Sequence, residues 1–125
     1  MTITHSAAAR ASLAAQVASL VAAGAGTAKV RCKDATVTIV DFDMSATPFG
    51  APSGGVITAN GLPLAGTAVA DGDVDNFEVL DKDANVIFAG SITATGGGGD
   101  MTFNNITITN GQDCSLTGAN YTVAA

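Results

Sequence analysis

The sequence has 125 residues, of which 47% are apolar, 5% are aromatic and 13% are charged, and it contains 15 glycines. This composition is unlike that of a helical enzyme and fits one domain with a thin core of small and β-branched side chains. Of the net charge of −6, residues 1–33 contribute +4 and residues 34–125 contribute −10, because all eleven acidic residues lie in the second part. The acidic body argues against nucleic acid as the main ligand, since phosphate binding requires clustered cations.

A helix is expected over residues 6–23. Ser6 is a suitable N-cap, alanine is the best helix former, and Gly24 and Gly26 follow the run. The large apolar residues fall at i, i+4, i+7 and i+8 and form a narrow stripe flanked by alanine: Leu13, Val17, Leu20 and Val21. This stripe is expected to pack either on the chain's own domain or on another subunit.

Residues 1–25 are therefore interpreted as an N-terminal arm and helix, and residues 26–125 as a β-sandwich domain. The apolar run 11–23 loosely resembles a signal peptide, but it is rich in alanine, interrupted by polar residues and not preceded by a basic cluster. It is also too short and too polar for a membrane span, so no membrane partner is expected. His5, the only histidine, is expected at the surface without a second metal ligand nearby.

The first strand signal follows the helix. Lys29, Arg31 and Lys33 alternate with Val30 and Cys32, which predicts a strand with one basic face and one apolar face. The basic face is either an ordinary solvated face or a contact stripe for an acidic partner.

Further strand signals come in quick succession. Residues 36–42 are rich in β-branched side chains, and shorter strands are expected at residues 56–59 and 66–70. A loop rich in proline and glycine at residues 46–55 and a turn at Asn60-Gly61 separate them.

Three aspartates at alternate positions, Asp71, Asp73 and Asp75, begin like a calcium-binding loop. The pattern then fails, because Asn76 stands where the loop needs glycine and Lys82 where it needs a bidentate glutamate. The run is interpreted as an acidic connection and only as a weak candidate metal site. No metal or other cofactor is expected.

The clearest hairpin of the chain covers residues 76–92. Two alternating apolar segments are separated by polar residues 81–85, which are of the types that favour tight turns. The alternation is expected to place five side chains on one buried face: Phe77, Val79, Val86, Phe88 and Ile92.

The last quarter of the chain is predicted to consist of short strands. Glycine-rich residues 95–100 predict a flexible linker, and Asn110-Gly111 is a strong turn signal. Closing strands are expected around residues 114–116 and 121–123. Roughly eight to ten short strands at close spacing favour an all-β fold, an antiparallel β-sandwich or jelly-roll-like domain with an N-terminal α-helix.

No constellation of catalytic residues is recognised in the sequence. With one histidine, neither a Ser-His-Asp nor a Cys-His arrangement is indicated, and CxxC, HExxH, P-loop and dinucleotide motifs are missing. The chain is therefore not expected to be an enzyme. Cys32 and Cys114 are interpreted as two free, buried thiols, with a disulfide between an early and a late strand as the alternative.

Three segments together resemble a family of small structural proteins of tailed bacteriophages that are encoded beside the major capsid protein. The segments are residues 48–60 (PFGAPSGGVITAN), the hairpin at residues 77–92, and residues 99–111 with their alternating isoleucines and threonines. The likeness lies in spacing and covers roughly residues 36–124. Asp83-Ala84-Asn85 replaces the usual glycine turn, and Met101 and Phe103 stand where leucines are common, and both replacements keep the family pattern.

The resemblance implies a β-sandwich head-decoration (cement) protein and brings no functional residues with it. Such a protein would bind the outside of the capsid through many weak contacts with the major capsid protein, repeated by symmetry. A self-associated dimer or trimer is expected, located on the exterior of the virion after assembly in the host cytoplasm. The residues expected to contact a partner are Arg10, Leu13, Val17, Leu20, Lys29, Arg31 and Lys33.

Two other functions are compatible with the sequence. The chain could be a tail or appendage module that recognises a host glycan or surface protein. It could also be a calcium-dependent binding module that uses the three aspartates.

Overall fold

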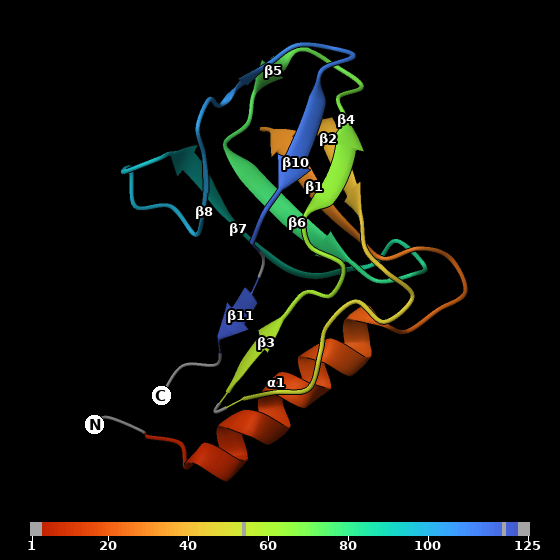
Figure 1. The fold of residues 1–125 in the computed structure, drawn as a ribbon, viewed down its shortest axis with the longest axis vertical. Coiled ribbons are helices and arrows are strands. Elements are labelled where there is room, and N and C mark those ends of the chain that lie inside the picture. The colour runs from red at the N-terminus through yellow and green to blue at the C-terminus, as the bar shows by residue number, and fades with distance from the viewer. Residues whose placement is uncertain (1–3, 54, 119, 123–125) are drawn as a thin grey trace.

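The computed structural model describes residues 4–53, 55–118 and 120–122, and these form one helix and eleven strands (Figure 1). Helix α1 covers Ala7–Val21 and precedes all the strands. This arrangement confirms a mostly β chain with an N-terminal helix. The strands are β1 (Lys29–Asp34), β2 (Val37–Asp43), β3 (Val56–Thr58), β4 (Leu64–Thr67), β5 (Gly72–Asp73), β6 (Asn76–Leu80), β7 (Val86–Ala94), β8 (Met101–Phe103), β9 (Thr107–Ile108), β10 (Asp113–Leu116) and β11 (Asn120–Thr122).

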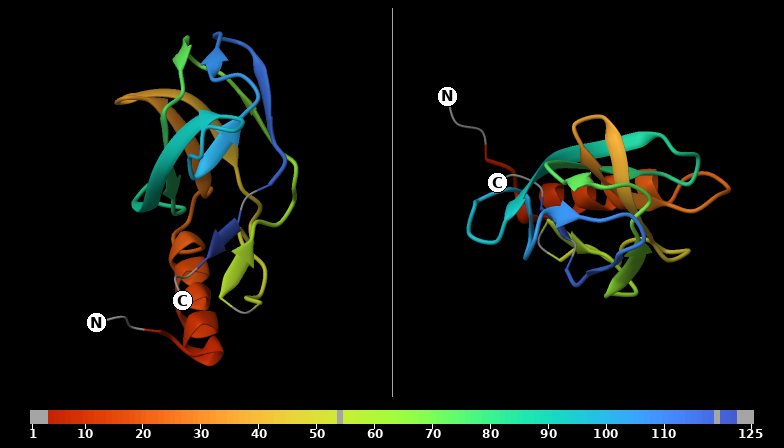
Figure 2. Two further views of the ribbon diagram at one scale, coloured as in Figure 1. Left: turned by 90° about the vertical axis from the view of Figure 1, so that its left-hand side faces the viewer. Right: turned by 90° about the horizontal axis from the view of Figure 1, so that it is seen from above.

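The largest sheet has five strands in the order β2-β1-β6-β7-β8. Its first four strands are antiparallel, whereas β8 pairs with β7 in parallel. The remaining strands form three ribbons, β10 with β4, β11 with β3, and β5 with β9. Together they give the curled, mainly antiparallel body that is seen from two further sides in Figure 2.

The curl brings the segment after β4 to the free edge of β2. The backbone N–H of Val69 donates to the carbonyl of Ile39 at 2.8 Å, and the N–H of Ala68 donates to the carbonyl of Gln112 at 2.8 Å. The core lies inside this curl, where β4 and β10 contact β2. Its largest fully buried side chains include Phe42, Ile39, Ile57, Leu80 and Ile108.

Helix α1 begins where the sequence predicts. The hydroxyl of Ser6 accepts a hydrogen bond from the N–H of Ala9 at 3.1 Å, which satisfies one of the free donors of the first turn. The predicted apolar stripe is only partly correct, because the helix turns Ala14 and Val21 toward the body. The large side chains beside that face, Leu13 and Leu20, remain 45% and 43% exposed.

The turn of the predicted hairpin holds the end of this helix. The N–H of Lys82 donates to the carbonyl of Ala23 at 2.9 Å, and the N–H of Gly26 donates to the carbonyl of Lys82 at 3.0 Å. The carboxylate of Asp83 accepts from the N–H of Ala25 at 3.3 Å. Residues 81–85 therefore join the helix to the sheet as well as joining two strands.

Strands β6 and β7 form the predicted hairpin, with one error in its buried face. Phe77, Val79 and Ile92 are buried, and Phe88, which pairs with Val79, is half-buried. Val86 is 50% exposed, contrary to the expectation. The reason is a register shift between Val79 and Leu80, a β-bulge that turns Leu80 inward.

The glycine-rich segment after the hairpin is a compact hook where the sequence predicts a flexible linker. Only residues 95–100 separate the parallel strands β7 and β8, although parallel neighbours usually need a crossover of about a dozen residues. Gly96 and Gly98 allow this short connection, because their φ angles of +89° and +80° suit glycine. The N–H of Gly99 closes the hook by donating to Oγ1 of Thr93 at 3.0 Å.

Candidate functional site

The three cations of β1 are neutralised within the chain. Nζ of Lys29 contacts the carboxylate of Asp43, and the guanidinium of Arg31 donates to both oxygens of Asp41 at 2.9 and 3.2 Å. These pairs follow from the register, in which Lys29 lies opposite Asp43 and Arg31 opposite Asp41. The hydrogen bond to Asp41 raises the pKa of Arg31.

The third cation completes the same pattern on the other side of β1. Nζ of Lys33 donates to Oε1 of Glu78 on β6 at 3.2 Å. The outward face of β2, β1 and β6 is therefore a ladder of alternating charges with no excess of either sign. A stripe of this kind offers an acidic partner little attraction, because each cation already has a carboxylate partner.

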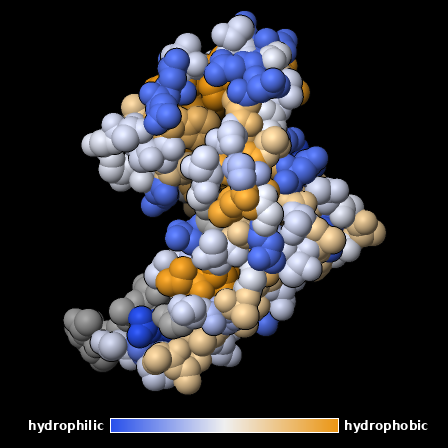
Figure 3. Space-filling view, in the orientation of Figure 1, coloured by the Kyte–Doolittle hydropathy of each residue, from blue (hydrophilic) through white to orange (hydrophobic). Residues whose placement is uncertain are grey.

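The helix offers a different surface. Leu13 and Leu20 are seven residues apart and lie on the same outward face of α1. Val17, in contrast, is half-buried against the body. Figure 3 shows one face of the molecule, on which apolar residues reach the surface in several separate spots among polar ones.

Arg10 is the remaining predicted contact residue, and it is half-buried. Its Nε atom is buried and has no hydrogen-bond partner among the described residues. Gly55 lies directly against its stem, since a Cβ at Gly55 would come within 2.8 Å of Cβ of Arg10. Of the seven predicted contact residues, Leu13 and Leu20 are thus the ones that present apolar surface outward.

The three aspartates of the calcium-like run accept hydrogen bonds from different segments of the chain. Asp71 accepts from the N–H of Asn110 at 2.6 Å, and Asp73 accepts from the hydroxyl of Thr107 at 2.8 Å. Asp75 accepts from Nδ2 of Asn76 at 2.6 Å and from the N–H of Ala35 at 3.1 Å, and these hydrogen bonds lower its pKa. Within the described ranges, no group of three or more potential ligand side chains is arranged to hold a metal ion.

The two cysteines are free thiols, as predicted, but only Cys32 is buried. Cys32 is completely buried on β1, and this burial raises its pKa to about 12. Cys114 on β10 is half-buried, and partial burial raises its pKa as well. The thiol of Cys32 is therefore unreactive in the folded protein, since only the thiolate is nucleophilic.

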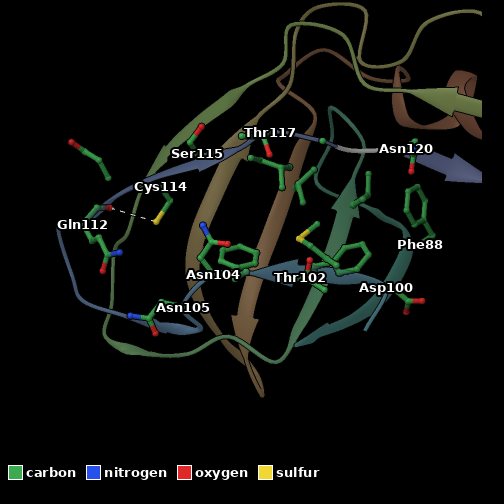
Figure 4. Close-up of a pocket in the computed structure, with 18 of the residues that line it drawn as sticks. Phe88, Asp100, Thr102, Asn104, Asn105, Gln112, Cys114, Ser115, Thr117 and Asn120 are labelled. Carbon is green, nitrogen blue, oxygen red and sulfur yellow. Dashed lines mark hydrogen bonds between the residues drawn. The ribbon is translucent and has the colours of Figure 1, made fainter. Parts of the chain in front are cut away.

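Sequence reasoning missed a groove of about 600 Å³ between β8 and β10. Figure 4 shows this groove, with β10 on one side and β8 on the other. Its apolar lining comes from the sheet, the loop before β3 and the strand ends: Val30, Phe49, Phe77, Val79, Phe88, Met101, Phe103 and Leu116. Four of the five phenylalanines of the chain meet here.

The rim of the groove is polar and carries no positive charge. Amides and hydroxyls surround the opening, together with the carboxylates of Asp100 and Asp113. No lysine, arginine or histidine is among the residues that line it. Besides Asp100, the polar side chains labelled in Figure 4 are Thr102, Asn104, Asn105, Gln112, Ser115, Thr117 and Asn120.

Both walls of the groove are strands with an unpaired edge. Strand β8 is hydrogen-bonded to β7 alone, and β10 to β4 alone, among the described strands. The second edge of each strand carries backbone donors and acceptors that no described strand uses. No signal in the sequence points to this site, because it arises only when β8 and β10 lie opposite each other without meeting.

Comparison with protein families, with curated proteins and with solved structures finds no match to this chain. No helix in the described part is both long enough and apolar enough to cross a membrane.

Proposed function

We propose that this chain is a structural protein of a tailed-bacteriophage virion, a decoration protein that binds the outer surface of the capsid and stabilises contacts between capsomers. The observation that carries the proposal is the exposure of Leu13 and Leu20 on the outward face of α1. The resemblance of the sequence over residues 36–124 to such proteins supports it. The proposed partners are the major capsid protein and other copies of this chain. The proposed location is the exterior of the virion.

The proposed contact is made by burial of apolar side chains. Each exposed leucine that becomes fully buried would contribute about 1.5–3 kcal/mol at most, so one copy would bind weakly. Many symmetry-related copies on one shell would make the sum large without any single strong site. The charge ladder on β1 does not form part of this contact surface, since its cations are already paired.

A β-sandwich or jelly roll is the finer fold that goes with this proposal. Two layers support it, the five-stranded sheet and the β4–β10 ribbon that contacts β2 across the core. A rigid two-layer body would hold α1 at a fixed angle, which a repeated contact on a symmetric shell requires.

The test is a double substitution on the helix, Leu13→Gln with Leu20→Gln. Both side chains are exposed, so the variant should unfold at the same temperature as the unchanged protein. Its occupancy on expanded capsids, measured by quantitative gel analysis of purified particles, should fall at least tenfold. Val37→Gln is the matched control, because Val37 is 52% exposed and lies on β2 away from the helix.

Unchanged occupancy of the double variant would contradict the proposed contact surface. The position of the chain in intact particles distinguishes the head from the tail. Many symmetric copies on the head agree with a decoration protein, whereas a small set in the tail would make it a tail or appendage component.

A further inference from the structure

We propose that the groove between β8 and β10 receives residues 2–5 of a second copy of this chain, which add a strand between the two free edges. An extended segment is the ligand that facing strand edges select, because its backbone can hydrogen-bond to both. The edges are short, since β8 has three residues and β10 has four. A segment of four residues matches their length.

The pattern of the segment fits the floor and the opening of the groove. In a strand, Ile3 and His5 would lie on one face, and Thr2 and Thr4 on the other. Ile3 could therefore meet the apolar floor around Phe88 and Phe103 while the threonines stay at the rim. Threonine and isoleucine are also among the residues that favour strands.

The charges of the groove and of residues 2–5 are compatible with binding. The groove has two carboxylates, Asp100 and Asp113, and no cation in its lining. The segment contains no acidic residue, and no acid occurs before Asp34. A segment from the acidic body would instead be repelled at the rim.

The direction of the helix favours a second copy over the chain's own groove. In Figure 1 and in the left view of Figure 2, α1 begins at the end of the molecule opposite to β8 and β10. Thr4, His5 and Ser6 are exposed, and Ser6 has an extended backbone with φ −65° and ψ 161°. Residues 4–6 are thus presented outward, where another molecule can reach them.

The experiment uses disulfide trapping between separate pools of full-length protein. All pools carry Cys114→Ser, and Cys32 is retained because its buried thiol does not react. One pool carries Thr4→Cys at the expected rim position, a second carries Ser115→Cys at the rim of the groove, and a third carries Val37→Cys as an exposed control outside it. Pools are mixed with oxidised glutathione, and the mixed disulfides are quantified by mass spectrometry on non-reduced samples.

The expected result is at least tenfold more disulfide between the first and second pools than between the first and third. Equal yields, or no disulfide with Ser115→Cys, would overturn the proposal. A chain that carries both Thr4→Cys and Ser115→Cys provides the second check. If it closes an internal disulfide at a concentration at which the pools do not react, the segment occupies its own groove and the second copy is excluded.

Deletion of residues 2–5 provides an independent measurement. The dissociation constant of the self-associated form, measured by sedimentation, should rise at least tenfold, and an unchanged constant would contradict the proposal. Self-association is measured on the isolated protein, so this inference does not depend on the proposed role in a virion. Failure of either one leaves the other standing.

Discussion

Asp81 organises the connection between the hairpin and the helix. It is only 7% exposed, and its Oδ1 accepts from the N–H groups of Asp83 and Asn85 at 2.9 Å each. Its Oδ2 accepts from Nδ2 of Asn85 at 3.2 Å. The backbone hydrogen bond from Asn85 is the main cause of a lowered pKa of Asp81, because these donors stabilise the charged form.

Asp81→Ala should therefore destabilise the protein in a pH-dependent way. The folded-state pKa lies below the unfolded value of about 3.9, so the contribution of the charged carboxylate is present above that value and is lost as the pH falls through the folded-state pKa. At pH 7 we expect the unfolding temperature to fall by a few degrees, on the order typical for a lost turn-stabilising side chain. The difference from the unchanged protein should shrink below pH 4.

Asp81→Asn is the matched control, since it keeps an acceptor but has no charge to titrate. Its difference in unfolding temperature from Asp81→Ala should stay constant between pH 7 and pH 3. Thermal unfolding followed by circular dichroism over this range provides the measurement. A difference between Asp81→Ala and the unchanged protein that does not vary with pH would show that the carboxylate carries no such role.

At the scale of elements, the close crossing of β4 over β2 depends on a glycine. A Cβ at Gly66 would lie 2.5 Å from the carbonyl oxygen of Asp41 and 3.0 Å from Cγ2 of Val40. The first of these contacts is with backbone, which cannot move aside without displacing β2 itself. Gly66 thus lets the β4–β10 ribbon approach the sheet at the core.

Gly66→Ala should therefore lower the free energy of unfolding by about 1–3 kcal/mol, the usual cost of overpacking a core. Gly118→Ala is the matched control, because a Cβ at Gly118 meets nothing within 4 Å, and it should stay within about 0.5 kcal/mol. Denaturant unfolding of both variants measures the difference. Equal effects of the two substitutions would show that β4 and β2 are not as close as described.

The sequence predicts individual strands better than it predicts their partners. The alternation around Phe77 and Val79 identifies the hairpin, because adjacent strands joined by a short polar turn pair with each other. Asn60-Gly61 and Asn110-Gly111 also lie in turns, yet the strands on either side of them do not pair. Those strands pair with distant ones, β3 with β11 and β4 with β10, and no local pattern encodes such a choice.

The same limit applies to the candidate site. The basic stripe on β1 is visible in the sequence, but Asp41 lies 10 residues after Arg31 and Glu78 lies 45 residues after Lys33. Only the strand register reveals that these charges cancel. The groove is still less predictable, because it exists where β8 and β10 do not pair. The sequence predicts the apolar stripe of the helix, but it does not indicate which residues of that stripe face outward.

At the scale of the whole molecule, the small share of the core that comes from the helix predicts that the β-body can fold without it. Among the described residues, α1 supplies only Ala14 and Val21 to the buried apolar core. Deleting residues 1–22 should therefore cost about 2–4 kcal/mol of unfolding free energy and leave a single cooperative transition in denaturant. Val21→Ala is the control, because it truncates the larger of these two core side chains, and it should lower the free energy of unfolding by about 1–2 kcal/mol. Loss of cooperative unfolding after the deletion would contradict the division into a helical arm and an autonomous β domain, because the strands would then need the helix to form a core at all.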